Sequence, residues 1–95
     1  MTQPRRGWTL AVGAHPAAAV EAMPKELQRA VLNFLSALAL EAGSAIDAGK
    51  PPPGQRLDEV GLRYSIVVQG EPVIVEYLAL RAARELRAAA LVWLH

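Results

Sequence analysis

Three arginines near the end of the chain, Arg81, Arg84 and Arg87, recur at intervals of three residues. A guanidinium group binds phosphate or carboxylate oxygens through two parallel hydrogen bonds, so this run suits contact with RNA or with an acidic protein segment. The same spacing is also typical of a solvated face, and Glu85 lies inside the run. Both interpretations stay open at this point.

The sequence contains no pattern for metal, nucleotide-loop or serine-hydrolase chemistry. It has no cysteine, and its two histidines, His15 and His95, lie near opposite ends of the chain. We therefore predict neither a metal site nor a cofactor. His15 precedes Pro16 and is expected to be a cap or turn residue at the start of a helix. No glycine-rich phosphate loop and no serine nucleophile elbow is present.

Length and composition predict a single small domain. The chain has 95 residues, of which 53% are hydrophobic, so most of it is expected to be folded. We expect residues 1–7 to form a flexible tail and residues 8–95 to form the domain. The most apolar stretch, residues 30–42, is interrupted by Asn33, Ser36 and Glu41, so we predict no membrane span and a cytoplasmic location.

The net charge is small. It is +1 at neutral pH, and basic and acidic residues are nearly balanced in both halves of the chain. Proteins that hold nucleic acid by neutralising phosphates usually carry a larger excess of Lys and Arg. The balance argues weakly against a dedicated nucleic-acid binder, although a local cluster of cations would suffice.

The first half of the chain reads as a strand followed by two helices. Residues 8–12 alternate bulky and small side chains, and a short Ala-rich helix follows from His15 to Met23, where Pro24 disfavours further helix. A longer helix begins at Pro24, and Gly43 is a plausible end for it. Its apolar stripe consists of Leu27, Val31, Phe34, Leu35 and Leu38. Such a helix needs a sheet to pack against.

The second half begins with a loop and a β-hairpin. Residues 48–54 are rich in Gly and Pro, and two β-branched and aromatic runs, 62–68 and 73–78, flank the turn residues 69–72. In the first run Tyr64 shares a face with Ile66, and Arg63 points to the other side. The second run is apolar on both faces, which predicts a central strand.

The end of the chain is ambiguous. Residues 79–90 are rich in Ala, Leu, Arg and Glu, so local propensity favours a helix over about 80–90, followed by an extended segment at 91–94. The alternative is a last strand over 88–94, with residues 81–87 as its connection. The expected class is α+β: two N-terminal helices on a small antiparallel sheet, in the order β-α-α-β-β-β or with a C-terminal helix.

This order of elements resembles the RelE/ParE superfamily of type II toxins. The likeness rests on Trp8 in the first strand, on the Met23-Pro24 break between the helices and on several later segments that are similar to family motifs. These segments are Gly49-Lys50-Pro51, Gly61-Leu62-Arg63-Tyr64-Ser65-Ile66, Gly70-Glu71-Pro72-Val73-Ile74-Val75-Glu76-Tyr77 and Ala90-Leu91-Val92-Trp93-Leu94-His95. Together they cover nearly the whole chain.

The resemblance implies a toxin that is neutralised by a cognate antitoxin protein and acts on messenger RNA at the ribosome or on DNA gyrase. It implies catalytic roles for Lys50, Arg63 and His95, and it makes Tyr77 a core residue. Our candidates for contact with RNA or a partner are Arg56, Arg81, Arg84 and Arg87. The family's arginine at the start of the third strand has no counterpart at Pro72 or Val73, so the catalytic set is incomplete and enzymatic activity stays an open question.

The alternative function is a non-enzymatic binding or assembly module of the same fold. The high apolar content predicts an exposed patch that is large enough for a homodimer or a complex with another protein. A helical DNA-binding regulator is a third possibility. It ranks last because only residues 81–87 offer a basic stripe.

Overall fold

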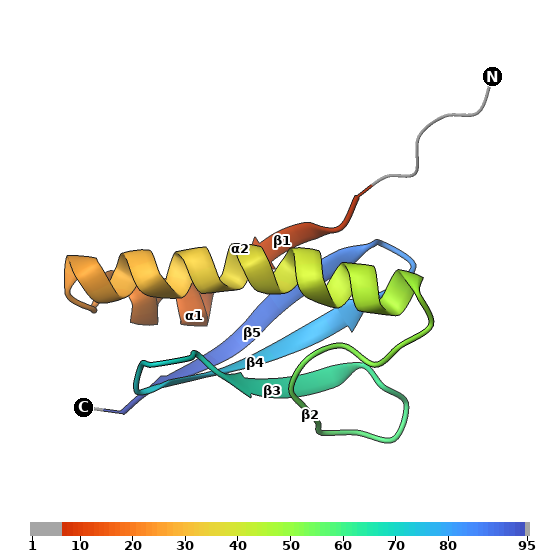
Figure 1. Ribbon diagram of the computed structural model, residues 1–95. Helices are drawn as coiled ribbons and strands as arrows, with labels where there is room; N and C mark the ends of the chain where they lie inside the picture. Colours follow the sequence, from red (N-terminus) through yellow and green to blue (C-terminus); the bar gives the residue numbers. More distant parts are fainter. Residues whose placement is uncertain (1–6, 95) are drawn as a thin grey trace.

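A computed structural model describes residues 7–94, and in it two helices lie on one face of a five-stranded sheet (Figure 1). This arrangement confirms the broad α+β class, with two N-terminal helices as predicted. The His95 position and residues 1–6 lie outside the described part of the chain. The elements are β1 (Thr9–Val12), α1 (Ala14–Glu21), α2 (Lys25–Asp47), β2 (Gln55–Arg56), β3 (Arg63–Val67), β4 (Val73–Leu80) and β5 (Glu85–Trp93).

The sheet has the order β1-β5-β4-β3-β2. Strands β2 to β5 pair antiparallel, and β4 is central as predicted, with Tyr64 opposite Tyr77 across β3 and β4. The edge strand β1 runs parallel to β5, with Thr9 opposite Glu85. The prediction of a wholly antiparallel sheet is therefore wrong. Two parallel strands need a long connection, and here both helices and the meander supply it.

Helix α2 is longer than its sequence pattern indicated. It begins after Pro24 and continues to Asp47, so the predicted end at Gly43 is wrong. Gly43 is buried inside the helix because the Trp8 side chain lies against it, and a Cβ atom at residue 43 would overlap Trp8 Cγ. The glycine serves close packing between α2 and the start of β1 and does not terminate the helix.

The core lies between α2 and the inner face of the sheet. The buried side chains of Val31 and Leu35 belong to one cluster with Val75 and Tyr77 of β4 and Leu86 of β5. By length and composition alone, α2 could cross a membrane: its most apolar 18-residue window has a mean hydropathy of 1.3. About a third of that window is buried, and these buried residues belong to the core between the helix and the sheet.

The segment predicted as a C-terminal helix is a strand. Strand β4 continues to Leu80, residues 81–84 form a turn, and β5 starts at Glu85, so the alternative prediction of a last strand has the right type but starts too late. Leu86, Ala88 and Leu91 point into the core, and an irregularity in the register opposite Glu76 and Tyr77 lets both Ala88 and Leu91 face inward. Burial on the sheet outweighs the helix propensity of this Ala-rich segment.

Candidate functional site

Three cationic side chains from separate segments meet in a pocket beside the C-terminal end of α2. Lys50 follows the helix, Arg56 belongs to β2, and Arg81 begins the turn between β4 and β5. The pocket has a volume of about 380 Å³ and is also lined by Glu59 and Tyr64. Among residues 7–94, none of the three cations makes an ion pair. The pocket therefore has a positive charge that is only partly offset by Glu59.

The position of Lys50 follows from how α2 ends. Gly49 has a φ of 75°, in the left-handed region, and its N–H donates to the Ile46 carbonyl at 3.0 Å. The Lys50 N–H donates to the Ala45 carbonyl at 2.8 Å. These two bonds form the glycine-terminated Schellman motif, which satisfies the last carbonyls of a helix. The motif turns the chain sharply and places Lys50 at the mouth of the pocket.

The loop before β3 is organised around the Asp58 carboxylate. It accepts hydrogen bonds from the backbone N–H groups of Gly61 at 3.0 Å, Leu62 at 3.0 Å and Arg63 at 3.1 Å. Partial burial acts to raise the pKa of Asp58, but the three N–H donors and the nearby Arg63 charge outweigh it and lower the pKa below its ordinary value. Asp58 thereby fixes the loop that carries Glu59.

The Gly61 carbonyl is shared by two pocket residues. The Tyr64 hydroxyl donates to it at 3.1 Å, and Arg81 donates to it through Nη1. Gly61 has a φ of 74°, and a Cβ atom there would approach the Tyr64 hydroxyl to 3.2 Å. Glycine thus lets Tyr64 and Arg81 converge on one carbonyl, which holds the Arg81 guanidinium at the edge of the pocket.

Of the predicted site residues that fall within 7–94, Lys50, Arg56 and Arg81 line one pocket and the others do not. Arg63 lies on the face of the sheet that carries no helix and pairs with Glu76 at 3.4 Å, so it does not line the pocket that contains Lys50. The inward side of β3 is taken by Tyr64, and strand alternation sends Arg63 to the opposite side. Nothing is described for His95.

The predicted basic face of residues 81–87 does not exist as one surface. Because the segment is a turn and a strand, its three arginines point to different places. Arg87 pairs with Glu85 at 2.7 Å on β5. Arg84 has a φ of 51° and pairs with Asp47 of α2. Only Arg81 reaches the pocket.

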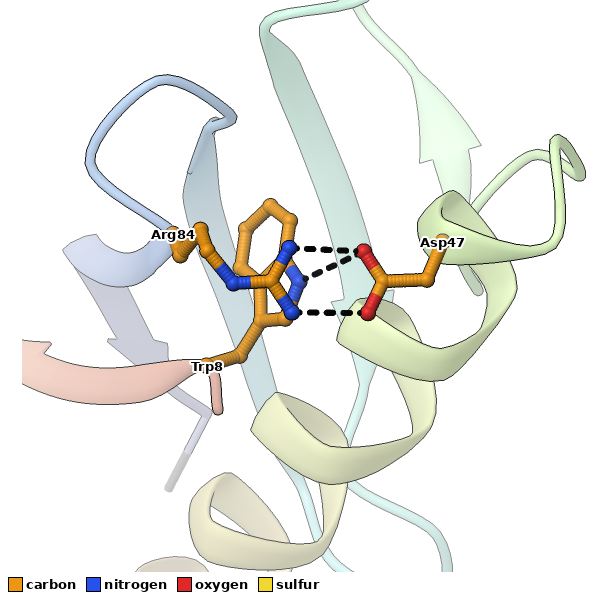
Figure 2. Close-up of polar contacts among 3 residues, drawn as sticks. All are labelled: Trp8, Asp47 and Arg84. Carbon is orange, nitrogen blue, oxygen red and sulfur yellow. Dashed lines mark hydrogen bonds and ion pairs between the residues drawn. The ribbon is translucent and has the colours of Figure 1, made fainter. Parts of the chain in front are cut away.

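Arg84, Asp47 and Trp8 form a compact cluster of polar contacts between the 81–84 turn, the end of α2 and the start of β1 (Figure 2). Arg84 donates to both carboxylate oxygens of Asp47, at 2.9 and 2.8 Å, and Trp8 Nε1 donates to the same carboxylate at 3.3 Å. The guanidinium carbon lies 5.6 Å from the centre of the Trp8 ring, within cation–π range. The hydrogen bonds to Asp47 raise the pKa of Arg84.

Sequence reasoning missed Glu59 and Tyr64 as pocket residues. Glu59 looks like any solvated loop acid, and Tyr64 looks like a core residue. The one available signal was Gly61, a residue type able to adopt a positive φ between them. The arrangement suits an anionic ligand that several cations can contact, with one carboxylate able to accept a proton. Within the described range, no three His, Asp or Glu side chains gather as metal ligands.

Comparison with protein-family models, with curated proteins and with solved structures finds no match for this chain.

Proposed function

We propose that the protein is a RelE/ParE-like growth-inhibiting toxin that binds and cleaves RNA in the pocket of Lys50, Arg56 and Arg81. The observation that carries the proposal is the meeting of these three cations, none of them ion-paired within residues 7–94, with a carboxylate in a hollow of about 380 Å³. Phosphodiesters are the biological anions that such a group of cations suits best. The antitoxin would be a protein that covers this pocket.

Each pocket residue has a role in this proposal. The three cations bind the scissile phosphate and stabilise the charge that grows on it in the transition state. Glu59 accepts the proton of the ribose 2′-hydroxyl, whose oxygen attacks phosphorus. The bond to the 5′ oxygen breaks, that oxygen takes a proton from solvent, and the products are a 2′,3′-cyclic phosphate and a free 5′-hydroxyl. Tyr64 orients Arg81 through the Gly61 carbonyl.

The test compares pocket variants with a matched variant outside the pocket. We expect Arg81→Ala and Lys50→Ala each to weaken binding of a short RNA by roughly tenfold at low salt, because each removes a phosphate contact. Arg63→Ala removes the same charge from the opposite face of the sheet and should change binding by less than about twofold. Equal losses in Arg63→Ala and Arg81→Ala would refute the pocket as the binding site.

The enzymatic step is tested separately. Glu59→Gln should bind RNA at least as tightly as the wild type but lose most cleavage, because the amide cannot accept the proton at neutral pH. Expression of the wild type in bacteria should arrest growth, and Glu59→Gln should not. If both proteins arrest growth without RNA cleavage, the ribonuclease proposal fails, and induction of DNA damage would then indicate gyrase as the target.

A second candidate function is the non-enzymatic binding module. It is favoured by an apolar row on the helix-free face of the sheet, where Val67, Ile74 and Val92 lie side by side on neighbouring strands. Val67 is 59% exposed and Val92 is 50% exposed. This function predicts stable association without toxicity. A clean monomer in size-exclusion chromatography over a wide concentration range, together with growth arrest, would reject it.

A further inference from the structure

The ion pair between Arg84 and Asp47 joins the turn that begins with Arg81 to the end of α2, which precedes Lys50. Asp47 is the last residue of α2 and lies three positions before Lys50. Arg84 is the last residue of the turn that begins with Arg81, and its N–H donates to the Arg81 carbonyl at 3.1 Å. Each partner of the ion pair is therefore connected through a short, hydrogen-bonded stretch of backbone to one pocket cation.

Arg84 is held at its backbone and at its side chain. The Thr9 N–H donates to the Arg84 carbonyl at 3.0 Å, which ties the turn to β1. The guanidinium binds Asp47 with two hydrogen bonds and lies over the Trp8 ring (Figure 2). The intervening turn residues Ala82 and Ala83 are exposed, so they add little packing of their own. The side-chain contacts of Arg84 therefore add a further restraint on this turn from outside the hairpin, beside the Thr9 bond to the Arg84 carbonyl and the Arg81 bond to the Gly61 carbonyl.

From this geometry we infer that Trp8, Asp47 and Arg84 are positioning residues, which hold Arg81 and Lys50 at a fixed separation before ligand binds. The inference rests on the proposed function for its biological meaning, since the positioned cations are those of the RNA pocket. The guanidinium of Arg84 is engaged by Asp47 and is not a ligand contact itself. Ordering a cation in advance lowers the entropy lost on binding, which raises affinity without any new contact.

The first test needs no RNA. In the wild type, the Arg81 guanidinium protons should give resolved, slowly exchanging NMR signals because Arg81 is held on the Gly61 carbonyl. Asp47→Asn and Arg84→Lys should broaden these signals or speed their exchange, because neither variant keeps the two-point pair. Arg87→Lys, which alters the exposed pair with Glu85 on the same hairpin, is the control and should leave them unchanged. Unchanged Arg81 signals in a folded Asp47→Asn variant would overturn the inference.

The second test uses the sign of the effect on RNA affinity. Asp47→Asn removes a negative charge near the pocket, so electrostatics alone predicts tighter RNA binding. Loss of positioning predicts binding that is weaker by roughly two- to tenfold. If Asp47 acts through Arg81, the loss should disappear when Arg81→Ala is already present. Tighter binding, or an equal loss in both backgrounds, would overturn the inference.

The two proposals fail in different ways. If Asp47→Asn changes the Arg81 signals but the wild type binds no RNA, the positioning inference stands and the proposed function is rejected. If the wild type binds RNA but neither variant changes the Arg81 signals, the proposed function stands and the positioning inference is rejected. Circular dichroism checks that each variant is folded. If Asp47→Asn is not folded, Arg84→Lys replaces it in both tests.

Discussion

Tyr64 and Tyr77 stack across β3 and β4, with ring centroids 5.4 Å apart and ring planes 19° from parallel. Both rings are buried on the inner face of the sheet, and each hydroxyl leaves the core to donate to a loop carbonyl. Tyr64 donates to Gly61, and Tyr77 donates to Pro53. The stacked pair thus ties two loops to the sheet. One follows Lys50 and the other carries Glu59, and both contribute residues to the cationic pocket.

Removing the Tyr77 hydroxyl should cost more stability than removing that of Tyr64. In Tyr77→Phe the Pro53 carbonyl loses its hydrogen bond from Tyr77, whereas in Tyr64→Phe the Gly61 carbonyl still accepts from Arg81. We expect urea unfolding to show a loss of about 1–2 kcal/mol for Tyr77→Phe and less than about 1 kcal/mol for Tyr64→Phe. The reverse order would contradict the roles assigned to these two hydroxyl groups.

Tyr77 should also make the protein less stable in alkali. Burial, followed by the nearby Tyr64 and Glu41, raises the pKa of Tyr77 above its ordinary value of 10.0. Above about pH 10 the unfolded chain releases this proton and the folded chain retains it, so the free energy of unfolding should fall as pH rises. Unfolding curves between pH 8 and 11 measure the slope. Tyr77→Phe should lose the part of this slope that comes from Tyr77. If the slope is the same in Tyr77→Phe and the wild type, the raised pKa of Tyr77 is disproved.

Asp58 should contribute to stability in the opposite range of pH. Its pKa is lowered because its three backbone N–H donors and Arg63 outweigh the effect of burial, so the stabilisation is present above the ordinary value of 3.8. It should be lost as pH falls through the lower, folded-state pKa. Thermal unfolding from pH 6 to pH 2 should show a smaller acid destabilisation in Asp58→Asn than in the wild type. Equal acid slopes would show that the loop does not depend on this carboxylate.

The sequence predicted those parts of the fold in which local pattern and burial agree. The β-hairpin around residues 69–72 and the apolar stripe of α2 have a period that matches their final environment, so their existence and type were correct. The loop at residues 48–54, which contains Lys50, was also predicted correctly, because Gly and Pro residues there interrupt regular structure. Element type was therefore predictable wherever one local signal dominated.

The remaining features depend on contacts between residues that are distant in sequence. β5 contains strong helix formers, and only pairing with β4 and β1 makes it a strand. Arg81 and Arg84 occupy one turn, yet they serve different neighbours, Gly61 and Asp47. Arg63 received its catalytic role from the family resemblance, and alternation correctly placed it opposite Tyr64, but only the packing of the helices shows that this side of the strand is the helix-free face. No local pattern specifies these partners.

Gly43 gives a prediction in which two effects oppose one another. Replacing a helical glycine with alanine normally stabilises a helix by about 1 kcal/mol. At residue 43, however, the new Cβ atom would overlap Cβ and Cγ of Trp8, which lie close to the backbone and cannot rotate away as the tip of a flexible chain does. Overpacking of this kind costs about 1–3 kcal/mol, so we expect Gly43→Ala to be less stable than the wild type.

The neighbouring position supplies the control for this prediction. Ser44 is exposed on the same helix, so Ser44→Ala changes propensity without a clash and should be neutral or slightly stabilising. Gly43→Ala should also displace the Trp8 ring from Arg84, which a shift in tryptophan fluorescence would report in a Trp93→Phe background. A Gly43→Ala protein as stable as Ser44→Ala, with unchanged Trp8 emission, would show that Trp8 does not pack against α2 in this way.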